Sequence, residues 1–327
     1  MNILGIETSC DETSVAVLHN ESILSNITYT QDVHAEYGGI VPEIASRAHL
    51  QKIEPLCRAA LDNAQVSLGD IGLVSVTDSP GLAGALLVGM SFAMGLHAQY
   101  GTPITGVNHL EGHIFSAFLE HPGLTYPFLA LVVSGGHTAI YRVTGFNAYE
   151  CLGQTLDDAA GEAFDKVGKV LGFAYPAGRA IEKEALCCAG DHDIVFPVAA
   201  ASRTGCDFSF SGLKTAVRYF IEERGEEYVR MHRPDICDAF QKAVVCSLVH
   251  ALRNAARLSG CKRIVLVGGV ACNGALRAEV ADEFGRDVFY PRPALCTDNA
   301  AMIARAGLEK AQHDLLSFPR LDVTRRL

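Results

Sequence analysis

Apolar segments with the spacing of strands recur along the chain, separated by short polar or glycine-rich turns. NILGIE (2–7) and SVAVLH (14–19) flank the polar turn TSCDET, whereas FLALVV (128–133) and AIYRV (139–143) flank the turn SGGHT. We predict a β-hairpin at each place, with small residues and free backbone N–H groups at its tip. Two ordinary hairpins would also fit, but the polar tips favour a phosphate or carboxylate site.

A longer pattern also occurs twice. IGLVSV (71–76) is followed by a glycine-rich turn and a helix, and TPITGVN (102–108) runs into NHLEGH and another helix. RIVLVGG (263–269) and DVFYPRP (287–293) begin the same succession in the second half, where the last helix follows CTDN. The repeated order of strand, turn and helix indicates an internal duplication.

The duplication predicts an α/β fold of two lobes that face each other across a central cleft, where such folds place their ligands. Residues 1–121 are expected to form the N-terminal lobe and residues 122–327 the C-terminal lobe with a helical insertion, with the option that the C-terminal helix packs back on the N-terminal lobe. Apolar residues at helical spacing predict further helices over 41–64, 157–172 and 235–260.

The most apolar run, residues 80–98, has no Asp, Glu, Lys or Arg but is rich in glycine. A membrane span usually needs about 20 strongly apolar residues, so we interpret this run as a buried helix and predict no membrane contact. The chain also starts with an apolar stretch that lacks Lys or Arg and meets acids at Glu7, Asp11 and Glu12, which is unlike a signal peptide.

Charge and cysteine content narrow the class of protein. The chain of 327 residues has 37 acidic and 27 basic side chains and a formal net charge of −10, which argues against nonspecific binding of nucleic acid. Its 11 cysteines include no C-x-x-C pair, so no disulfide framework or zinc knuckle is visible. A reducing compartment fits this usage, and we expect a cytoplasmic protein.

The segment NHLEGH places His109 and His113 one helical turn apart on the same face. The zinc-protease motif H-E-x-x-H has its glutamate directly after the first histidine, whereas Glu111 comes two residues after it. The duplication makes Asp298 equivalent in position to His109, on the opposite lobe. Two imidazoles and a carboxylate would form a metal site that suits iron(II) or zinc. A core histidine pair and an aspartate that only caps the next helix remain the alternatives.

Glycine-rich turns predict where an anion would bind. Val132, Val133, Ser134, Gly135 and Gly136 end a strand with backbone that an anion can approach closely.

A second such turn, Gly268-Gly269, precedes Asn273 near a helix start, and together the turns suggest a nucleotide. Asp165 is a candidate acceptor for ribose hydroxyls, although by itself the residue is better explained by a solvated helix face.

The likeliest basic surface is the segment 207–220. Lys214 and Arg218 lie four positions apart, with Arg203 upstream and with aromatic residues between them that could stack on unpaired bases. These aromatic residues are Phe208, Phe210 and Tyr219. A packed amphipathic helix is the alternative.

Eight motifs in order resemble the tRNA adenosine threonylcarbamoyltransferase family. They are GIETSCDETSVAV, PGLAGALLVGM, NHLEGH, LVVSGGHT, DDAAGEAFDKVGKVLG, FSFSGLKT, GGVACNGALR and CTDNAAMIA, and they cover residues 5 to about 304. The SGGHT form with His137 is similar to the bacterial branch.

The resemblance implies an actin/sugar-kinase/Hsp70-like (RNase H-like) fold. It implies transfer of the threonylcarbamoyl group from threonylcarbamoyl-adenylate to the exocyclic amine of the adenosine beside the anticodon, in tRNAs that read codons beginning with A, with release of AMP. It also implies an inactive-paralogue partner protein and a small ATPase.

The resemblance further implies one metal ion, usually assigned as iron, at the positions of His109, His113 and Asp298. The nucleotide positions that carry over are Val132, Val133, Ser134, Gly135, Gly136, Asp165, Gly178 and Asn273.

The chain departs from the family pattern at two turns. It has Ser79 where the family commonly has glycine before Pro-Gly-Leu, and Ala177 and Arg179 where the family has Tyr-Pro-Gly-Gly-Pro. Gly178 is retained, and Arg179 puts the edge of the ribose site in doubt.

Asp11 and its neighbour Glu12, on the first hairpin tip, are the candidate catalytic residues. Asp11 would position or deprotonate the attacking amine, although an Asx turn that shapes the tip would also explain it. Three other functions remain open: a small-molecule kinase on the same fold, a noncatalytic nucleotide-binding scaffold, and a metalloprotease, which is the weakest because H-E-x-x-H is absent from the sequence.

Overall fold

A computed structural model of the chain describes residues 1–188, 190, 192–198, 205–324 and 327. Unit 1 comprises residues 1–124 and 291–327, and unit 2 comprises residues 125–290. Among the described residues, no helix is both long and apolar enough to cross a membrane. The apolar run at 80–98 forms most of helix α2, as predicted.

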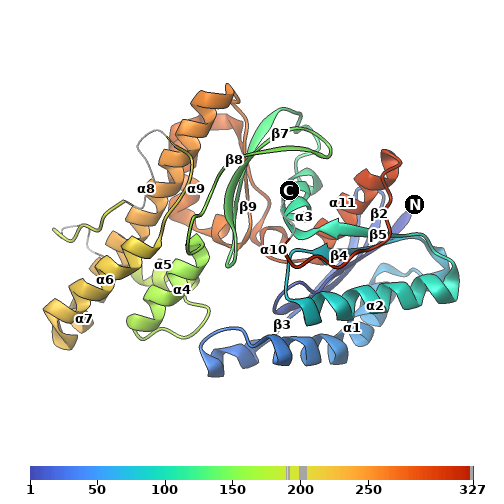
Figure 1. The fold of residues 1–327 in the computed structure, drawn as a ribbon, viewed down its shortest axis with the longest axis horizontal. Helices are drawn as coiled ribbons and strands as arrows, with labels where there is room; N and C mark the ends of the chain where they lie inside the picture. Colours follow the sequence, from blue (N-terminus) through green and yellow to red (C-terminus); the bar gives the residue numbers. More distant parts are fainter. Residues whose placement is uncertain (189, 191, 199–204, 325–326) are drawn as a thin grey trace. The chain divides into compact units, whose positions relative to one another are not determined.

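Unit 1 contains a five-stranded sheet with helices on both faces (Figure 1). Its strands are β1 (Asn2–Glu7), β2 (Glu12–His19), β3 (Ser22–Thr30), β4 (Ile71–Ser79) and β5 (Ile104–Asn108). Its helices are α1 (Pro42–Ala64), α2 (Ala83–Tyr100), α3 (His109–Ser116), α10 (Pro293–Cys296) and α11 (Ala300–Gln312), with 3-10 turns η1 (Asp32–Tyr37), η2 (Leu68–Asp70) and η3 (Ala117–Leu119).

The strand order of unit 1 is β3-β2-β1-β4-β5. Strands β1 and β2 form the predicted antiparallel hairpin, and β4 and β5 add in parallel. Side chains alternate across the sheet: Leu4 and Ile6 face the core under α1 and α2, while Ile3 and Leu18 face the core under α11. Both faces of the sheet are therefore buried.

Helix α11 is the last helix of the described residues, and it packs closely against β1, the first strand of the chain. A Cβ atom at Gly5 of β1 would lie 2.2 Å from the carbonyl oxygen of Ala300, so only glycine allows this approach. The backbone N–H of Ala300 donates to Ser14 Oγ at 2.9 Å. Strands β1 and β2 therefore fix where the N-terminus of α11 lies.

Unit 2 repeats the plan of unit 1. Its sheet order, β10-β9-β6-β7-β8, places an antiparallel hairpin beside parallel strands in the same succession as in unit 1. The strands are β6 (Phe128–Val133), β7 (Thr138–Gly145), β8 (Ala148–Gln154), β9 (Ile264–Val267) and β10 (Val288–Phe289). The duplication predicted from the sequence is thus confirmed at the level of strand topology, although β10 is only two residues long.

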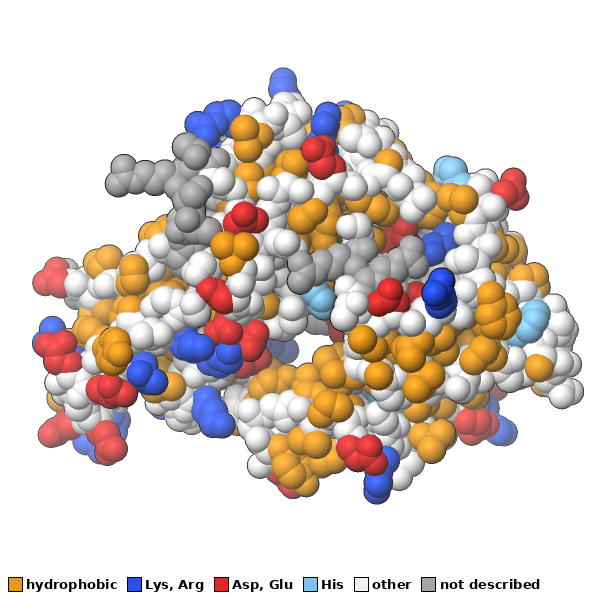
Figure 2. All heavy atoms as spheres, viewed as in Figure 1, with side chains coloured by type: hydrophobic (Ala, Val, Ile, Leu, Met, Phe, Trp, Pro, Cys, Tyr) orange, Lys and Arg blue, Asp and Glu red, His pale blue; other side chains and the backbone are white. Residues whose placement is uncertain are grey.

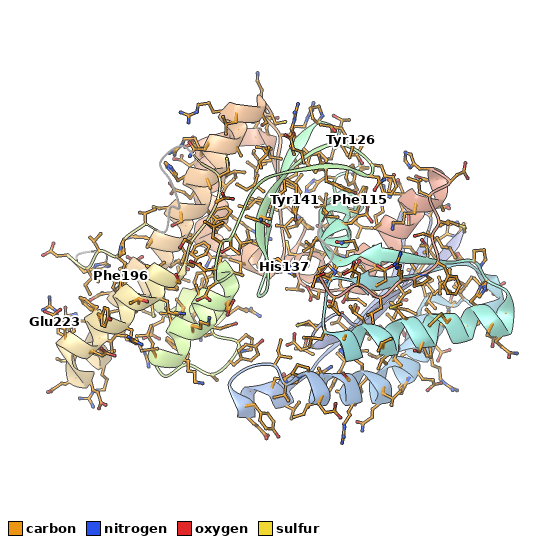
Figure 3. All side chains as sticks on the ribbon, in the orientation of Figure 1. Phe115, Tyr126, His137, Tyr141, Phe196 and Glu223 are labelled. Carbon is orange, nitrogen blue, oxygen red and sulfur yellow. The ribbon has the colours of Figure 1, made fainter. Side chains whose placement is uncertain are left out.

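The helices of unit 2 cover its sheet and extend beyond it (Figure 1). They are α4 (Ala160–Val170), α5 (Gly178–Ala185), α6 (Ser211–Arg224), α7 (Glu226–Met231), α8 (Arg233–Ser259) and α9 (Gly274–Phe284), with 3-10 turns η4 (Gly269–Cys272) and η5 (Gly285–Asp287). Tyr141 of β7 is among the large side chains that fill this core (Figure 3). Phe164 of α4 meets Phe240 of α8 edge to face, with ring centroids 5.1 Å apart.

We expect Gly5→Ala to lower the free energy of unfolding by about 1–3 kcal/mol, because the added methyl group would push α11 away from β1. Gly95→Ala is the matched control, since its Cβ would meet no atom within 4 Å in helix α2 and alanine favours a helix by up to about 1 kcal/mol. Urea denaturation measures both changes. Equal effects of the two substitutions would contradict the packing constraint.

Candidate functional site

Helix α3 begins with the two histidines that the sequence predicts as ligands. The side chain of Asn108 caps the helix by accepting hydrogen bonds from the N–H groups of Leu110 and Glu111, at 2.9 and 3.3 Å. The cap fixes the first turn, so that His109 and His113 lie on one face with ring centroids 4.6 Å apart.

Asp298 meets these histidines from the segment between α10 and α11. Its Oδ1 atom lies 3.0 Å from His113 Nε2 and 3.5 Å from His109 Nε2. All three residues belong to unit 1, so the expectation that Asp298 comes from an opposite lobe is wrong. The N-cap of α11 is Asn299, which accepts a hydrogen bond from the N–H of Met302 at 3.1 Å, so Asp298 is not needed for capping.

The residues present fit a metal ion. One ligand atom from each of His109, His113 and Asp298 lies within 4.8 Å of the others. His113 is fully buried, and among the described residues neither of its ring nitrogens has a hydrogen-bond partner, although Nε2 has the short approach to Asp298. A buried imidazole without such partners is costly, and a cation between the nitrogen and the carboxylate would remove that cost.

His109 is oriented by residues that the sequence reasoning did not identify. Its Nδ1 atom lies 3.1 Å from Glu7 Oε2 and 3.2 Å from Ser9 Oγ. Glu7 is buried at the end of β1, where it also accepts hydrogen bonds from the backbone of Ser9 and the hydroxyl of Thr77. Because Glu7 contacts Nδ1, the other ring nitrogen of His109, Nε2, faces Asp298. A metal-ligating histidine typically has this arrangement, with its second nitrogen bonded to an outer carboxylate. A glutamate as the last residue of an apolar strand was the available signal in the sequence.

The charges of this cluster shift its pKa values. Burial lowers the pKa of His109, but the negative charges of Asp298 and Glu7 outweigh burial and raise it to about 9 in the metal-free chain. Burial raises the pKa of Glu7, but the charge and hydrogen bond of His109 more than offset this effect, so the pKa lies below its usual value. The two groups thus form a buried ion pair that holds the ring in place.

The two predicted catalytic carboxylates lie at the tip of the first hairpin, as expected. Burial, followed by the charges of Asp298 and Asp11, raises the pKa of Glu12 well above its usual value. Burial, followed by Asp11 and Asp298, also raises the pKa of the Cys10 thiol. The charge of Asp298 therefore reaches Glu12 at this hairpin tip.

Glu111, the acid between the histidines, is buried and lies 3.6 Å from Lys310 Nζ of α11. The same ammonium group donates to the carbonyl oxygen of Gly106 at 2.7 Å. Glu111 therefore helps to join α3 to α11, which supports the interpretation that it is not a protease base.

In unit 2, the predicted nucleotide positions from Val132 to Gly136 form the end of β6 and the turn that follows it. Ser134 N–H donates to the carbonyl oxygen of His137 at 2.8 Å, which closes the SGGHT turn, whose His137 is marked in Figure 3. Gly135 and Gly136 are exposed, and a Cβ at either would meet nothing within 4 Å. The backbone of this turn is therefore open to a ligand.

Two close backbone contacts bring other elements to this turn. A Cβ at Gly161 of α4 would lie 2.6 Å from the carbonyl oxygen of Ser134, and one at Gly268 would lie 2.4 Å from that of Val133. Gly268 also has a φ of 95°, a conformation that favours glycine. The start of α4 and the turn after β9 thus meet Val132, Val133 and Ser134.

The remaining predicted positions are held by local hydrogen bonds. Asp165 Oδ1 accepts the N–H of Ala177 at 2.7 Å, directly before Gly178 begins α5. Asn273 caps α9 by accepting the N–H of Leu276 at 2.9 Å, and its amide donates to Gln241. Asp165 therefore positions the turn that carries Gly178, whether or not it also contacts a ribose.

The predicted basic surface is largely neutralised by acids. Lys214 donates to Asp158 at 2.9 Å, and Arg218 pairs with Glu222. Phe208 and Phe210 are fully buried, so the expectation that they stack on bases is wrong for this structure.

Tyr219 remains exposed. Arg203 lies outside the described residues.

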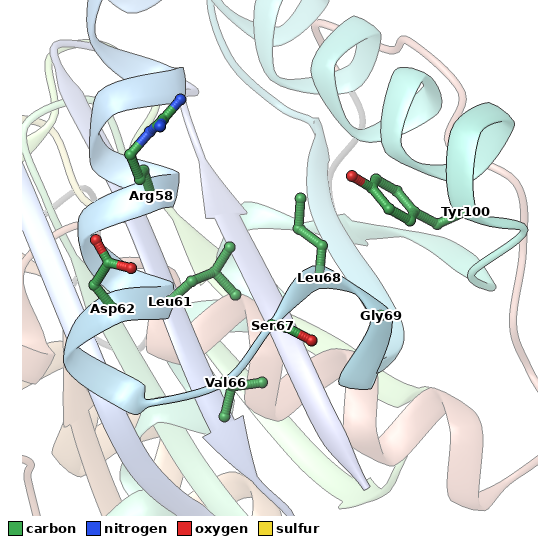
Figure 4. A pocket seen from close by; sticks show the side chains of 8 residues that line it. All are labelled: Arg58, Leu61, Asp62, Val66, Ser67, Leu68, Gly69 and Tyr100. Atoms are coloured by element: carbon green, nitrogen blue, oxygen red, sulfur yellow. The ribbon is translucent and has the colours of Figure 1, made fainter.

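One shallow pocket of 380 Å³ lies in unit 1 near the C-terminal ends of α1 and α2 (Figure 4). Its lining includes Arg58, Leu61, Asp62, Ser67, Leu68 and Tyr100. Its polar groups pair locally, because Arg58 binds Glu54 and Ser67 binds Asp70. The pocket contains none of the predicted site residues.

The fold and the site together define a class: an α/β protein of two duplicated units with a candidate His-His-Asp metal centre. A solved structure of similar fold is the Acidaminococcus fermentans (R)-2-hydroxyglutaryl-CoA dehydratase component A, with a TM-score of 0.56 and 16% identity over 95% of this chain and 100% of that one. The actin/sugar-kinase/Hsp70-like fold class is confirmed.

Sequence comparison identifies the family. The family model for tRNA N6-adenosine threonylcarbamoyltransferase matches residues 22–305. A curated relative with that name from Gemmatimonas aurantiaca is 48% identical, over 100% of this chain and 97% of the relative. Another, from Thermodesulfovibrio yellowstonii, is 49% identical, over 95% of this chain and 94% of the relative. The chain therefore belongs to the tRNA N6-adenosine threonylcarbamoyltransferase family and is an acyltransferase that modifies tRNA.

We expect His113→Ala to abolish binding of one divalent ion, whereas His313→Ala, an exposed histidine on the segment after α11, leaves it intact. Because metal uptake must displace the proton of His109, apparent affinity should rise with pH between about 6.5 and 9, by up to about tenfold per unit. Calorimetric titration of the chelator-treated chain in buffers of different ionisation enthalpy measures both affinity and proton release. Affinity that stays constant over this range would contradict the assignment of His109.

Proposed function

We propose that the chain transfers the threonylcarbamoyl group from threonylcarbamoyl-adenylate to the exocyclic amine of the adenosine beside the anticodon, in tRNAs that read codons beginning with A. In this reaction the amine nitrogen bonds to the carbamoyl carbon, the bond from that carbon to the phosphate oxygen breaks, and AMP leaves. The observation that carries the proposal is the His109-His113-Asp298 cluster, within a chain of this family.

We assign the cluster to one divalent ion, with Fe²⁺ as the first choice and zinc as the second, because two imidazoles and one carboxylate suit both. When bound, the ion would supply electrostatic stabilisation of charge on donor oxygens. Glu7 and Ser9 support the site by orienting His109 at 3.1 and 3.2 Å. The low exposure of all three ligands, of which Asp298 is the most exposed at 18%, keeps bulk water from the ligand atoms.

Asp11 is the residue that we assign to the attacking amine, as its positioning group or its base, with Glu12 as the second candidate. Its support is location, since both residues lie at the hairpin tip of unit 1, where the charge of Asp298 acts on Glu12. Proton transfer of this kind contributes about 10²–10⁴-fold to rate, and orientation of donor and amine could supply roughly 7–11 kcal/mol in well-ordered cases.

We assign the nucleotide part of the donor to unit 2. The support is the open backbone at Gly135 and Gly136, and the close approach of Gly161 and Gly268 to the same turn. Backbone N–H groups at such a turn are suited to phosphate oxygens. Val132, Val133, Ser134, Asp165, Gly178 and Asn273 complete the proposed nucleotide positions. Arg179, directly after Gly178, is the place where ribose contacts would differ from those of relatives.

The decisive experiment incubates the metal-loaded chain and its partner proteins with threonylcarbamoyl-adenylate and unmodified tRNA, and detects the modified nucleoside by mass spectrometry. We expect Asp11→Asn to reduce transfer by about 10²–10⁴-fold while metal and donor binding stay intact. Asp32→Asn, an exposed acid in η1, is the control that should retain full transfer.

Full transfer by the Asp11→Asn variant would show that Asp11 is not the base. Steady ADP production from ATP and a small hydroxyl acceptor, independent of tRNA, would favour a kinase instead. Full complementation by a His109→Ala, His113→Ala variant would indicate a noncatalytic scaffold.

We further propose that an inactive-paralogue partner protein covers an apolar surface on unit 1, and that a small ATPase joins this complex. Leu50 of α1 and Leu87 of α2 expose 69% and 45% of their surface, and we call this area the α1–α2 surface. Hydrophobic side chains gather over these two helices in Figure 2. The two helices are in close contact, since a Cβ at Gly84 of α2 would lie 2.3 Å from Ser46 Oγ of α1.

The partner would also strengthen tRNA binding, because the chain carries a net charge of −10 and Lys214 and Arg218 are already paired with acids. Since tRNA is the substrate, we place the reaction in the cytoplasm.

We expect Leu50→Glu with Leu87→Glu to weaken partner binding by about tenfold or more, because a charge at the centre of an apolar interface is costly. Leu258→Glu, at a residue of α8 in unit 2 that is 66% exposed, is the matched control. Size-exclusion chromatography and calorimetry with the purified partner measure the change. An unchanged affinity would place the partner elsewhere, and unchanged metal content in all variants would show that the fold is intact.

A further inference from the structure

A second group of metal-ligating side chains lies in unit 2, apart from every residue assigned above. Cys188 follows the C-terminal end of α5, His192 lies shortly after it, and Asp235 is in the first turn of α8. One ligand atom from each lies within 4.8 Å of the others. The sequence contains no C-x-x-C pair, so only the packing of α5 on α8 reveals this group.

Neighbouring contacts hold the start of α8 and the end of α5 together at this place. Arg233 Nε donates to Glu184 Oε1 at 3.0 Å, across the two helices. Cys188 Sγ lies within 4.8 Å of an Asp235 carboxylate oxygen, and it accepts the N–H of Gly190 at 3.2 Å. The three donor groups thus converge on a position set by tertiary packing.

The histidine of this group is oriented by a second carboxylate. His192 Nε2 lies 3.0 Å from Asp238 Oδ2, and His192 Nδ1 accepts the N–H of Ile194 at 3.2 Å. With Nε2 as the donor to Asp238, Nδ1 is the unprotonated nitrogen, and a metal ion would take the lone pair that accepts the N–H of Ile194 in this structure. A ligating histidine whose other nitrogen donates to a carboxylate is a recurring feature of zinc sites. Lys242, 2.7 Å from Asp238, offsets the charge of that outer carboxylate.

We propose that Cys188, His192 and Asp235 bind a divalent transition-metal ion, with zinc as the ion that this donor set favours. Thiolate sulfur, imidazole nitrogen and carboxylate oxygen are the three ligand types that zinc uses in proteins. Binding requires the Cys188 thiol to release its proton, after which the sulfur bonds to the ion. The partly buried setting leaves the fourth position to water.

The sulfur ligand distinguishes this site from the His109-His113-Asp298 cluster, and its role differs too. An ion bound at this site would join the C-terminal end of α5 to the first turn of α8. Gly178 is the first residue of α5, so an ion here would stabilise the helix that carries one proposed nucleotide position. By linkage, an ion that binds only the folded chain raises the midpoint of thermal unfolding.

The test uses full-length chain stripped with a chelator, in a His109→Ala, His113→Ala background that removes the first site. We expect this background to bind one zinc ion per chain, and to develop a thiolate-to-metal charge-transfer band when cobalt(II) is added. Cys188→Ser in the same background should lose both the ion and the band. Cys187→Ser, at the exposed neighbouring cysteine, is the matched control and should keep both.

Further measurements distinguish zinc binding at this site from a general effect of the substitutions on folding. Asp238→Asn should weaken zinc affinity by roughly 10–100-fold, as expected for an outer carboxylate, and circular dichroism checks that each variant is folded. Zinc should raise the unfolding temperature of the background chain but not of its Cys188→Ser variant. Absence of zinc binding in the folded background chain, or retention of the cobalt band after Cys188→Ser, would show that the group is only a hydrogen-bond network and would overturn the proposal.

Discussion

The contact between helix α11 and strand β1 is the constraint on which the metal centre depends. Gly5 lets the helix backbone approach until a methyl group would no longer fit, and Ser14 accepts a hydrogen bond from the first residue of the helix at 2.9 Å. Further along, a Cβ at Gly307 would lie 1.8 Å from Ser75 Oγ. Since α11 is held both at its first residue and further along at Gly307, Asp298, two residues before the helix, has one position relative to α3.

The electrostatics of unit 1 follow from that placement. Glu7, Glu12 and Asp298 are acids gathered around one buried histidine pair, and only His109 has a buried carboxylate as its partner. Burial and mutual repulsion raise the pKa of Glu12, whereas the ion pair with His109 lowers that of Glu7. A divalent cation would relieve the excess of negative charge and satisfy His113. Metal binding and the acid–base properties of the hairpin tip are therefore coupled.

The duplicated topology gives the two units the same hairpin but different chemistry. In unit 1 the tip carries Asp11 and Glu12, and in unit 2 the tip is the open glycine turn at Gly135 and Gly136. A carboxylate tip suits proton transfer, and a bare backbone tip suits an anion. Divergence of two equivalent turns thus accounts for the separate assignments of acyl chemistry and nucleotide binding.

Much of the local structure was predictable from the sequence, because strand and helix periods are set by neighbouring residues. The strands at 2–7 and 128–133 and the helix within the apolar run 80–98 follow from patterns of this kind. The pair His109 and His113 was also visible, since helical spacing alone puts them on one face.

The tertiary structure decided what residues distant in sequence do together. It placed Asp298 in the same unit as the histidines, because α11 packs on β1, a contact that no local pattern encodes. It buried Phe208 and Phe210, and it paired Lys214 with Asp158. It also brought Cys188 and Asp235 together across two helices. Residue type and spacing determined which groups can ligate a metal ion, whereas long-range packing determined which of them meet.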